Sequence, residues 1–236
     1  MHNNGHRLVL FDIDGTLLSA GKVARESILR ALESAYGWKA RDEHSNRQKF
    51  DFSGKTDPQI VRELVTADVG PGRCEAGLER ALAVYLEELE RQLSPEAVVP
   101  KPGIPKLLER LSGDARVTLA LLTGNLERGA RLKLEPPGYN RYFPFGAFGS
   151  DSADRYELPR IAVERAFDRT GRRFSEKTVV VVGDSVHDVA CGRSIGVRSV
   201  AVATGPTPWE RLEAENPDAL LPDFSDTERS LEAILG

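Results

Sequence analysis

The chain has 236 residues, of which 40% are hydrophobic, and its 32 lysine and arginine residues against 36 aspartate and glutamate residues give a formal net charge of −4 at pH 7. This composition is typical of a globular protein with one large domain, or with one core and a smaller module. It contains no basic block and no basic run interleaved with aromatic residues, so nucleic acid is not an expected partner.

The sequence also argues against a secreted or membrane protein. Two cysteines, Cys74 and Cys191, give neither a disulfide framework nor the spacing of a zinc site. No apolar run approaches the ~20 residues needed to cross a bilayer. Residues 1–7 lack the apolar segment and cleavage site of a signal peptide. We therefore expect a cytoplasmic protein with no membrane partner.

An apolar run near the start of the chain ends in two acids. Residues 8–11 (Leu-Val-Leu-Phe) have the composition of a buried strand, and Asp12, Asp14 and Gly15 follow them. Alternate residues of a strand point to the same side, so both carboxylates can face one point while Gly15 lets the chain turn away. Two acids aimed together repel unless a cation lies between them. Because ligands bind at the carboxyl ends of parallel strands, the pair predicts a magnesium-dependent site.

The next segment is predicted to be all-helical. Apolar residues recur at helical spacing between Ala24 and Tyr36, and Gly37 is a good terminator. Asp57 is a plausible N-cap for a second helix, with Pro58 in its first turn. The predicted helices cover residues 24–36, 58–69 and 74–93, and a polar loop covers 39–49. Strand-like sequence flanks this segment on both sides, which is typical of an inserted helical module.

After a short predicted helix over residues 104–111, predicted strands and helices alternate from residue 116 onward. The strands cover residues 117–122, 143–148, 178–182, 197–203 and 219–221. The helices cover residues 104–111, 126–134, 156–170, a segment ending at 195, and 226–235. Such alternation implies βαβ units. We expect an α/β fold whose core is a Rossmann-like, doubly wound parallel sheet.

Polar side chains follow three of the predicted strands. Asp12 and Asp14 follow the first, residues 123–125 (Thr-Gly-Asn) follow the second, and Asp184 and Asp188 follow the fourth. In a doubly wound sheet all three groups lie on one rim. A strand end that leads into a helix N-terminus attracts anions, because free N–H groups and the helix dipole both favour negative charge. The rim is therefore expected to hold both a metal and an anion.

These three groups resemble motifs of the haloacid dehalogenase superfamily, specifically its phosphatase branch with enzymes such as phosphoglycolate phosphatase. The first, second and fourth motifs are residues 12–17 (Asp-Ile-Asp-Gly-Thr-Leu), 123–125 (Thr-Gly-Asn) and 183–188 (Gly-Asp-Ser-Val-His-Asp). The resemblance covers about residues 7–16 and 100–205. It implies a Rossmann-like catalytic core over residues 1–17 and 98–236, and a helical cap domain over 18–97.

The resemblance also implies a role for each motif residue. Asp12 would be the nucleophile that forms an aspartyl-phosphate, and Asp14 the general acid and base. The phosphoryl group would be bound by Thr123, Gly124 and Asn125. Mg²⁺ would be held by Asp12, Asp14 through its backbone carbonyl, Asp184 and Asp188. His187 is expected to take no part in catalysis.

The third motif departs from the family pattern. The family commonly places a lysine there, but residues 154–160 contain none. A guanidinium can balance the same anionic charge, so Arg155 is the expected phosphate-binding replacement and Arg160 the substitute. In the helical segment, Lys55 lies where the family often places a loop facing the substrate. It is either an anion contact or a solvated loop lysine.

The resulting hypothesis is a magnesium-dependent phosphatase acting on a small phosphorylated metabolite. Asp14 argues against a dehalogenase, because the resemblance implies that those enzymes lack the second aspartate. A phosphomutase keeps both aspartates and remains an alternative. So does a non-catalytic phosphate-binding regulatory protein, which the absent third-motif lysine would favour.

Overall fold

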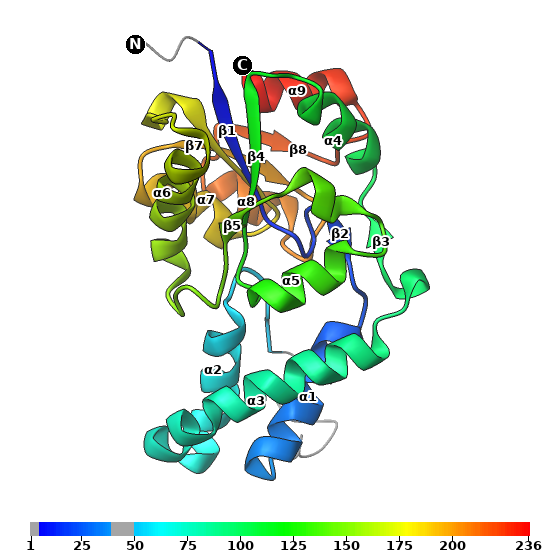
Figure 1. The fold of residues 1–236 in the computed structure, drawn as a ribbon, viewed down its shortest axis with the longest axis vertical. Helices are drawn as coiled ribbons and strands as arrows, with labels where there is room; N and C mark the ends of the chain where they lie inside the picture. The colour runs from blue at the N-terminus through cyan, green and yellow to red at the C-terminus, as the bar shows by residue number, and fades with distance from the viewer. Residues whose placement is uncertain (1–4, 39–49) are drawn as a thin grey trace.

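The computed structural model describes residues 5–38 and 50–236, and a six-stranded parallel sheet forms its centre (Figure 1). The strand order is β5-β4-β1-β6-β7-β8. The strands are β1 (Arg7–Phe11), β4 (Val117–Leu122), β5 (Gly146–Ala147), β6 (Val179–Gly183), β7 (Arg198–Val202) and β8 (Ala219–Leu221). The order runs outward from β1 in both directions, so the sheet reverses its winding beside this strand. The expected doubly wound α/β fold is confirmed, and ligands of such sheets bind at this reversal.

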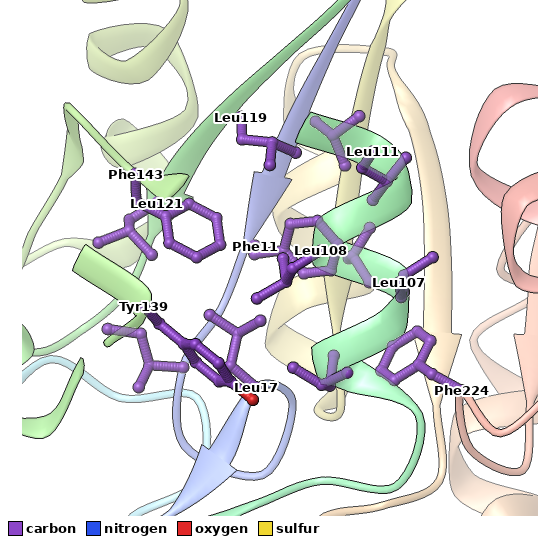
Figure 2. Packing of buried hydrophobic residues seen from close by; sticks show 14 of the residues in the cluster. Phe11, Leu17, Leu107, Leu108, Leu111, Leu119, Leu121, Tyr139, Phe143 and Phe224 are labelled. Carbon is purple, nitrogen blue, oxygen red and sulfur yellow. The ribbon is translucent and has the colours of Figure 1, made fainter. Parts of the chain in front are cut away.

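Both faces of the sheet are buried under helices. On β1, Val9 and Phe11 join the apolar cluster formed with α4 (Ile104–Ser112) and α9 (Thr227–Leu235), which Figure 2 shows from close by. Leu8 and Leu10 point to the opposite face and pack with α6 (Leu158–Thr170). This two-sided burial explains why the central strands are continuous apolar runs.

Three helices lie beyond the carboxyl ends of the strands (Figure 1). They are α1 (Val23–Tyr36), α2 (Asp57–Val69) and α3 (Pro71–Gln92). Their apolar faces form a separate buried cluster, to which Leu126 of the core also belongs. Short antiparallel strands, β2 (Leu18–Ser19) and β3 (Val99–Pro100), pair where the chain leaves the sheet and returns. The domain limits 1–17, 18–97 and 98–236 stay a prediction, and we propose that this paired ribbon is the junction.

The remaining helices connect strands at the sheet. They are α5 (Glu127–Leu134), α7 (Val186–Ser194) and α8 (Trp209–Ala214). α5 follows β4, and its Gly129 lies against Leu86 and Tyr85 of α3. α5 is therefore part of the surface on which the three helices α1 to α3 pack. No helix among the described residues is long and apolar enough to cross a bilayer. The expected cytoplasmic location stays a prediction.

Several local expectations are corrected. Thr56, not Asp57, caps α2, because its hydroxyl accepts a hydrogen bond from the Gln59 N–H at 3.2 Å. The strand expected over 143–148 is reduced to Gly146–Ala147, since only these two residues pair with β4 and a 3-10 turn over residues 139–142 directly precedes Phe143. α3 begins at Pro71 rather than at residue 74, and a 3-10 turn over residues 155–157 precedes α6. The loop expected over 39–49 lies outside the described residues.

Candidate active site

Asp12, the residue directly after β1, forms a buried ion pair with Arg155. Nη2 of Arg155 donates to Oδ1 of Asp12 at 3.1 Å and also to Oδ1 of Asp188. The Arg155 side chain is 4% exposed and that of Asp188 is 3% exposed. A buried guanidinium needs such partners, because an unpaired charge in the interior is strongly unfavourable. The structure therefore places Arg155 between the first and fourth motifs, while Arg160 is exposed on α6.

Three buried carboxylates gather around this arginine. Asp12, Asp184 and Asp188 each offer an oxygen, and these oxygens lie within 4.8 Å of one another. Burial raises the pKa of Asp12 to about 7, with Asp188 and Asp14 adding to the rise and Arg155 opposing it. Burial, Asp12 and Asp188 also raise the pKa of Asp184. One guanidinium is too little positive charge for three acids, and an all-oxygen donor set fits a hard divalent cation such as Mg²⁺.

The backbone around Gly15 allows Asp184 to approach the end of β1. Gly15 has φ +92°, and a Cβ there would lie 2.4 Å from Oδ2 of Asp184. Any side chain would thus meet both backbone strain and a steric clash. Beside it, the Thr16 hydroxyl donates to Oδ1 of Asp184 at 3.0 Å. Gly15 and Thr16 therefore position a metal-ligand candidate as well as turning the chain.

Asp188 is oriented by the start of α7. Its Oδ2 accepts hydrogen bonds from the Ser185 N–H at 3.0 Å and the Ser185 hydroxyl at 2.6 Å. This reciprocal cap leaves Oδ1 of Asp188 for Arg155. The neighbouring His187 pairs its Nδ1 with the Tyr156 hydroxyl at 2.8 Å. The expectation that His187 takes no part in catalysis stays a prediction.

The side chain of Asp14 lies apart from the acid cluster. Its Oδ2 accepts hydrogen bonds from Nδ2 of Asn125 at 2.8 Å and from Nζ of Lys133 at 2.6 Å. Nδ2 of Asn125 also donates to the Thr123 hydroxyl at 2.8 Å. That both acids face one point stays a prediction. Strand alternation cannot be its cause, because β1 ends at Phe11 and does not extend to Asp14.

A cavity of about 470 Å³ lies between this rim and the helices α1 to α3. Its core side includes Asp12, Asp14 and Thr123, and its other side includes Lys55 and Tyr85. Nζ of Lys55 is paired with Glu63 and lies 4.2 Å from the centre of the Phe50 ring. The Tyr85 hydroxyl is buried, and no described residue hydrogen-bonds it. The cavity can therefore hold a molecule against both the acid cluster and the helices.

A family model described as haloacid dehalogenase-like hydrolase matches residues 9–202. The chain belongs to the haloacid dehalogenase-like hydrolase family. The resemblance inferred from the motifs is thus confirmed, and the matched range contains the entire acid cluster from Asp12 to Asp188.

Named relatives of this hydrolase span nearly its whole length. It is 26% identical over 229 residues to the probable phosphatase IndB of Dickeya dadantii, with 97% of this chain and 94% of that protein covered. It is 27% identical over 219 residues to a phosphoglycolate phosphatase of Pseudomonas fluorescens, with 92% and 77% covered. The crystal structure of a hydrolase from Pseudomonas syringae superimposes with a TM-score of 0.73 at 18% identity, covering 98% of this chain and 100% of that one. The structural likeness supports the fold.

Sequence reasoning missed Lys133 in this hydrolase. A signal that could have identified it is its place in α5. The buried residues of this helix recur at helical spacing, and they are Gly129, Ala130, Lys133 and Leu134. A lysine on an otherwise apolar helix face needs a buried acceptor. Here Nζ of Lys133 donates hydrogen bonds to Oδ2 of Asp14 at 2.6 Å and to Oδ1 of Asn125 at 2.5 Å.

The loop before α2 docks directly on the second motif. The Asp57 N–H donates to the Gly124 carbonyl at 2.8 Å, and Oδ2 of Asp57 accepts from the Leu126 N–H at 2.8 Å. A Cβ on Gly124 would lie 2.1 Å from the Lys55 carbonyl oxygen. The glycine in the middle of Thr-Gly-Asn is therefore required by close backbone contact, and the helices are held over the rim.

Asp57 provides a test of this packing between the start of α2 and the second motif. Burial raises the pKa of its carboxyl from 3.8 to about 6, although Lys133 and the Leu126 N–H oppose the rise. The folded protein then binds this proton more tightly than the unfolded chain, so the free energy of unfolding falls as pH rises through that window. Asp57→Asn keeps an oxygen for the Leu126 N–H and removes the charge.

We expect Asp57→Asn to gain about 2 kcal/mol in unfolding free energy relative to wild type between pH 4 and pH 7, in metal-free buffer. Urea unfolding at several pH values measures this difference. Glu33→Gln, which removes an exposed carboxyl of α1, is the control and should show no such gain. If the free energies of unfolding of Asp57→Asn and wild type changed with pH in parallel, the Asp57 carboxyl would not be buried between α2 and the second motif.

Proposed function

We propose that this hydrolase is a magnesium-dependent phosphatase that cleaves a small phosphomonoester through an aspartyl-phosphate on Asp12. The main support is the placement of Asp12, which lines the cavity, is held by Arg155 and lies beside two further buried carboxylates. Family membership and phosphatases among its relatives support the same reaction class.

In the first step, a carboxylate oxygen of Asp12 attacks phosphorus while the bond from phosphorus to the leaving oxygen breaks. Asp14 gives its proton to that oxygen, so the product leaves as an alcohol. Arg155 keeps Asp12 in place and offers N–H groups to the transferring phosphoryl oxygens. The hydroxyl of Thr123 lines the same part of the cavity and is a second donor candidate.

In the second step, water attacks the phosphorus of the aspartyl-phosphate and gives a proton to Asp14. The phosphorus bond to Asp12 breaks, which releases inorganic phosphate and restores both carboxyl groups. Mg²⁺ held by Asp12, Asp184, Asp188 and the Asp14 backbone carbonyl would neutralise phosphoryl charge, the main requirement of phosphoryl transfer. The three-carboxylate donor set fits this ion.

The cavity limits the size of the leaving group. Its volume of about 470 Å³ suits a small metabolite, and Lys55 on its cap side is the proposed contact for a further polar or anionic group. Its pairing with Glu63 would have to rearrange for that contact. We propose no nucleic acid or membrane partner.

The decisive experiment measures phosphate release from a panel of small phosphomonoesters with Mg²⁺ and with EDTA. We expect turnover with Mg²⁺, its loss in EDTA, and its return when excess Mg²⁺ is added. We also expect Mg²⁺ to raise the melting temperature, because it offsets repulsion among the three acids. Full activity in EDTA would contradict the metal assignment.

The same panel separates the alternatives. Isomerisation of a phosphorylated sugar that requires a bisphosphate primer and releases little phosphate would identify a phosphomutase. Binding of phosphomonoesters with neither phosphate release nor isomerisation would identify a non-catalytic binding protein.

A further inference from the structure

Lys133 is a buried cation whose partners belong to the proposed catalytic machinery. Its side chain is 3% exposed, and Nζ contacts Oδ2 of Asp14 and Oδ1 of Asn125. Burying an ammonium group is strongly unfavourable unless it is paired and hydrogen-bonded. Apolar packing of α5 would be served better by leucine or methionine at this position. The polar contacts of Lys133, rather than apolar packing in the core, therefore account for a lysine at this position.

The contacts anchor one oxygen of Asp14 and leave the rest of the carboxylate open. Oδ2 accepts from both Lys133 and Asn125, yet 42% of the Asp14 side chain is exposed, and Asp14 lines the cavity. An exposed aspartate would otherwise sample several rotamers, and ordering it at the reaction step would cost entropy. The anchor is itself rigid, because Asn125 is fixed to the Thr123 hydroxyl.

We propose that Lys133 is a positioning residue that holds the Asp14 carboxyl group ready for proton transfer to the leaving oxygen. This inference rests on the proposed phosphatase function and concerns only the proton-transfer part of it. The phosphoryl group itself is assigned to Arg155, the metal site and Thr123, so Lys133 has a distinct task.

A leaving-group comparison tests this role. Cleavage of an alkyl phosphate needs a proton on its poor leaving oxygen, whereas nitrophenolate leaves without one. We expect Lys133→Met to lower kcat/KM for an alkyl phosphate on the order of 100-fold, and for nitrophenyl phosphate by less than about 3-fold. Lys133→Gln, which keeps a donor without the charge, should lie between Lys133→Met and wild type. Arg128→Met removes an exposed cation from the same helix and should change neither value.

The double variant with Asp14→Asn completes the test. Asp14→Asn should give the same leaving-group pattern, and adding Lys133→Met to it should cost little more, since both changes remove one function. Equal losses for the two esters, or additive losses in the double variant, would overturn the positioning role. Melting curves show whether an activity loss in Lys133→Met is caused by misfolding. If it is, the two esters are compared with Lys133→Gln instead. If wild type hydrolyses neither ester, the proposed function fails, which is a different result.

Discussion

Asp12→Asn is expected to reduce phosphate release by a factor on the order of 10⁴ or more, because an amide cannot replace the carboxylate as nucleophile. The substitution nearly preserves shape, so the cavity and the Arg155 side chain have no steric reason to move. Phosphate release by the variant and wild type, with the best ester of the panel and saturating Mg²⁺, measures the loss. Mass spectrometry of acid-quenched wild type should find the phosphoryl group on the peptide that contains Asp12.

The same variant has an opposite expected effect on stability. The pKa of Asp12 is raised to about 7, so its charge destabilises the folded state at and above that pH. We expect Asp12→Asn to raise the unfolding free energy in metal-free buffer at pH 8 by about 1 kcal/mol or more. Added Mg²⁺ should then stabilise the variant less than wild type. An inactive variant that is also less stable would indicate misfolding, and near-wild-type activity would exclude Asp12 as the nucleophile.

The sheet could be predicted because its sequence signal is local. The run Val179–Val182 is buried on both faces, so nearly every position is apolar and no amphipathic helix competes with the assignment. The first, second and fourth motifs follow from this, since each begins where an apolar strand stops. Their meeting on one rim needs only the parallel direction of the strands.

Contacts across elements could not be predicted in the same way. The partner of Asp14 depends on how α5 lies against the rim, and no periodicity within residues 12–17 contains that information. The strand expected over 143–148 shows the same limit: aromatic residues favour strands in general, but pairing with β4 extends only to Gly146 and Ala147. Arg155 could be selected because the family resemblance implies a cation near the start of α6 and a guanidinium can balance the anionic charge there. Its contact with Asp188 joins two distant elements and has no local sequence signal.

Arg155→Met is expected to damage both stability and activity. It leaves the carboxylates of Asp12, Asp184 and Asp188 buried without their guanidinium, a change that typically costs about 3–5 kcal/mol. Arg155 opposes the raised pKa values of Asp12 and Asp184, so without it these two acids would bind protons still more tightly in the folded state. The stability loss should therefore be greater at pH 8 than at pH 5. Urea unfolding at the two pH values measures this dependence.

Activity separates the guanidinium's role from simple charge balance. Mg²⁺ can supply positive charge to the three acids, so it should recover part of the stability of Arg155→Met. It cannot hold Oδ1 of Asp12 as Nη2 does, and kcat should remain lower by a factor of about 10²–10³. Arg155→Lys keeps the charge without the planar fork and should recover only part of the activity. Arg160→Met, an exposed change one turn further along, is the control. If Arg160→Met loses kcat/KM while Arg155→Met keeps it, the third-motif charge belongs to Arg160, and the ion pair with Asp12 serves stability alone.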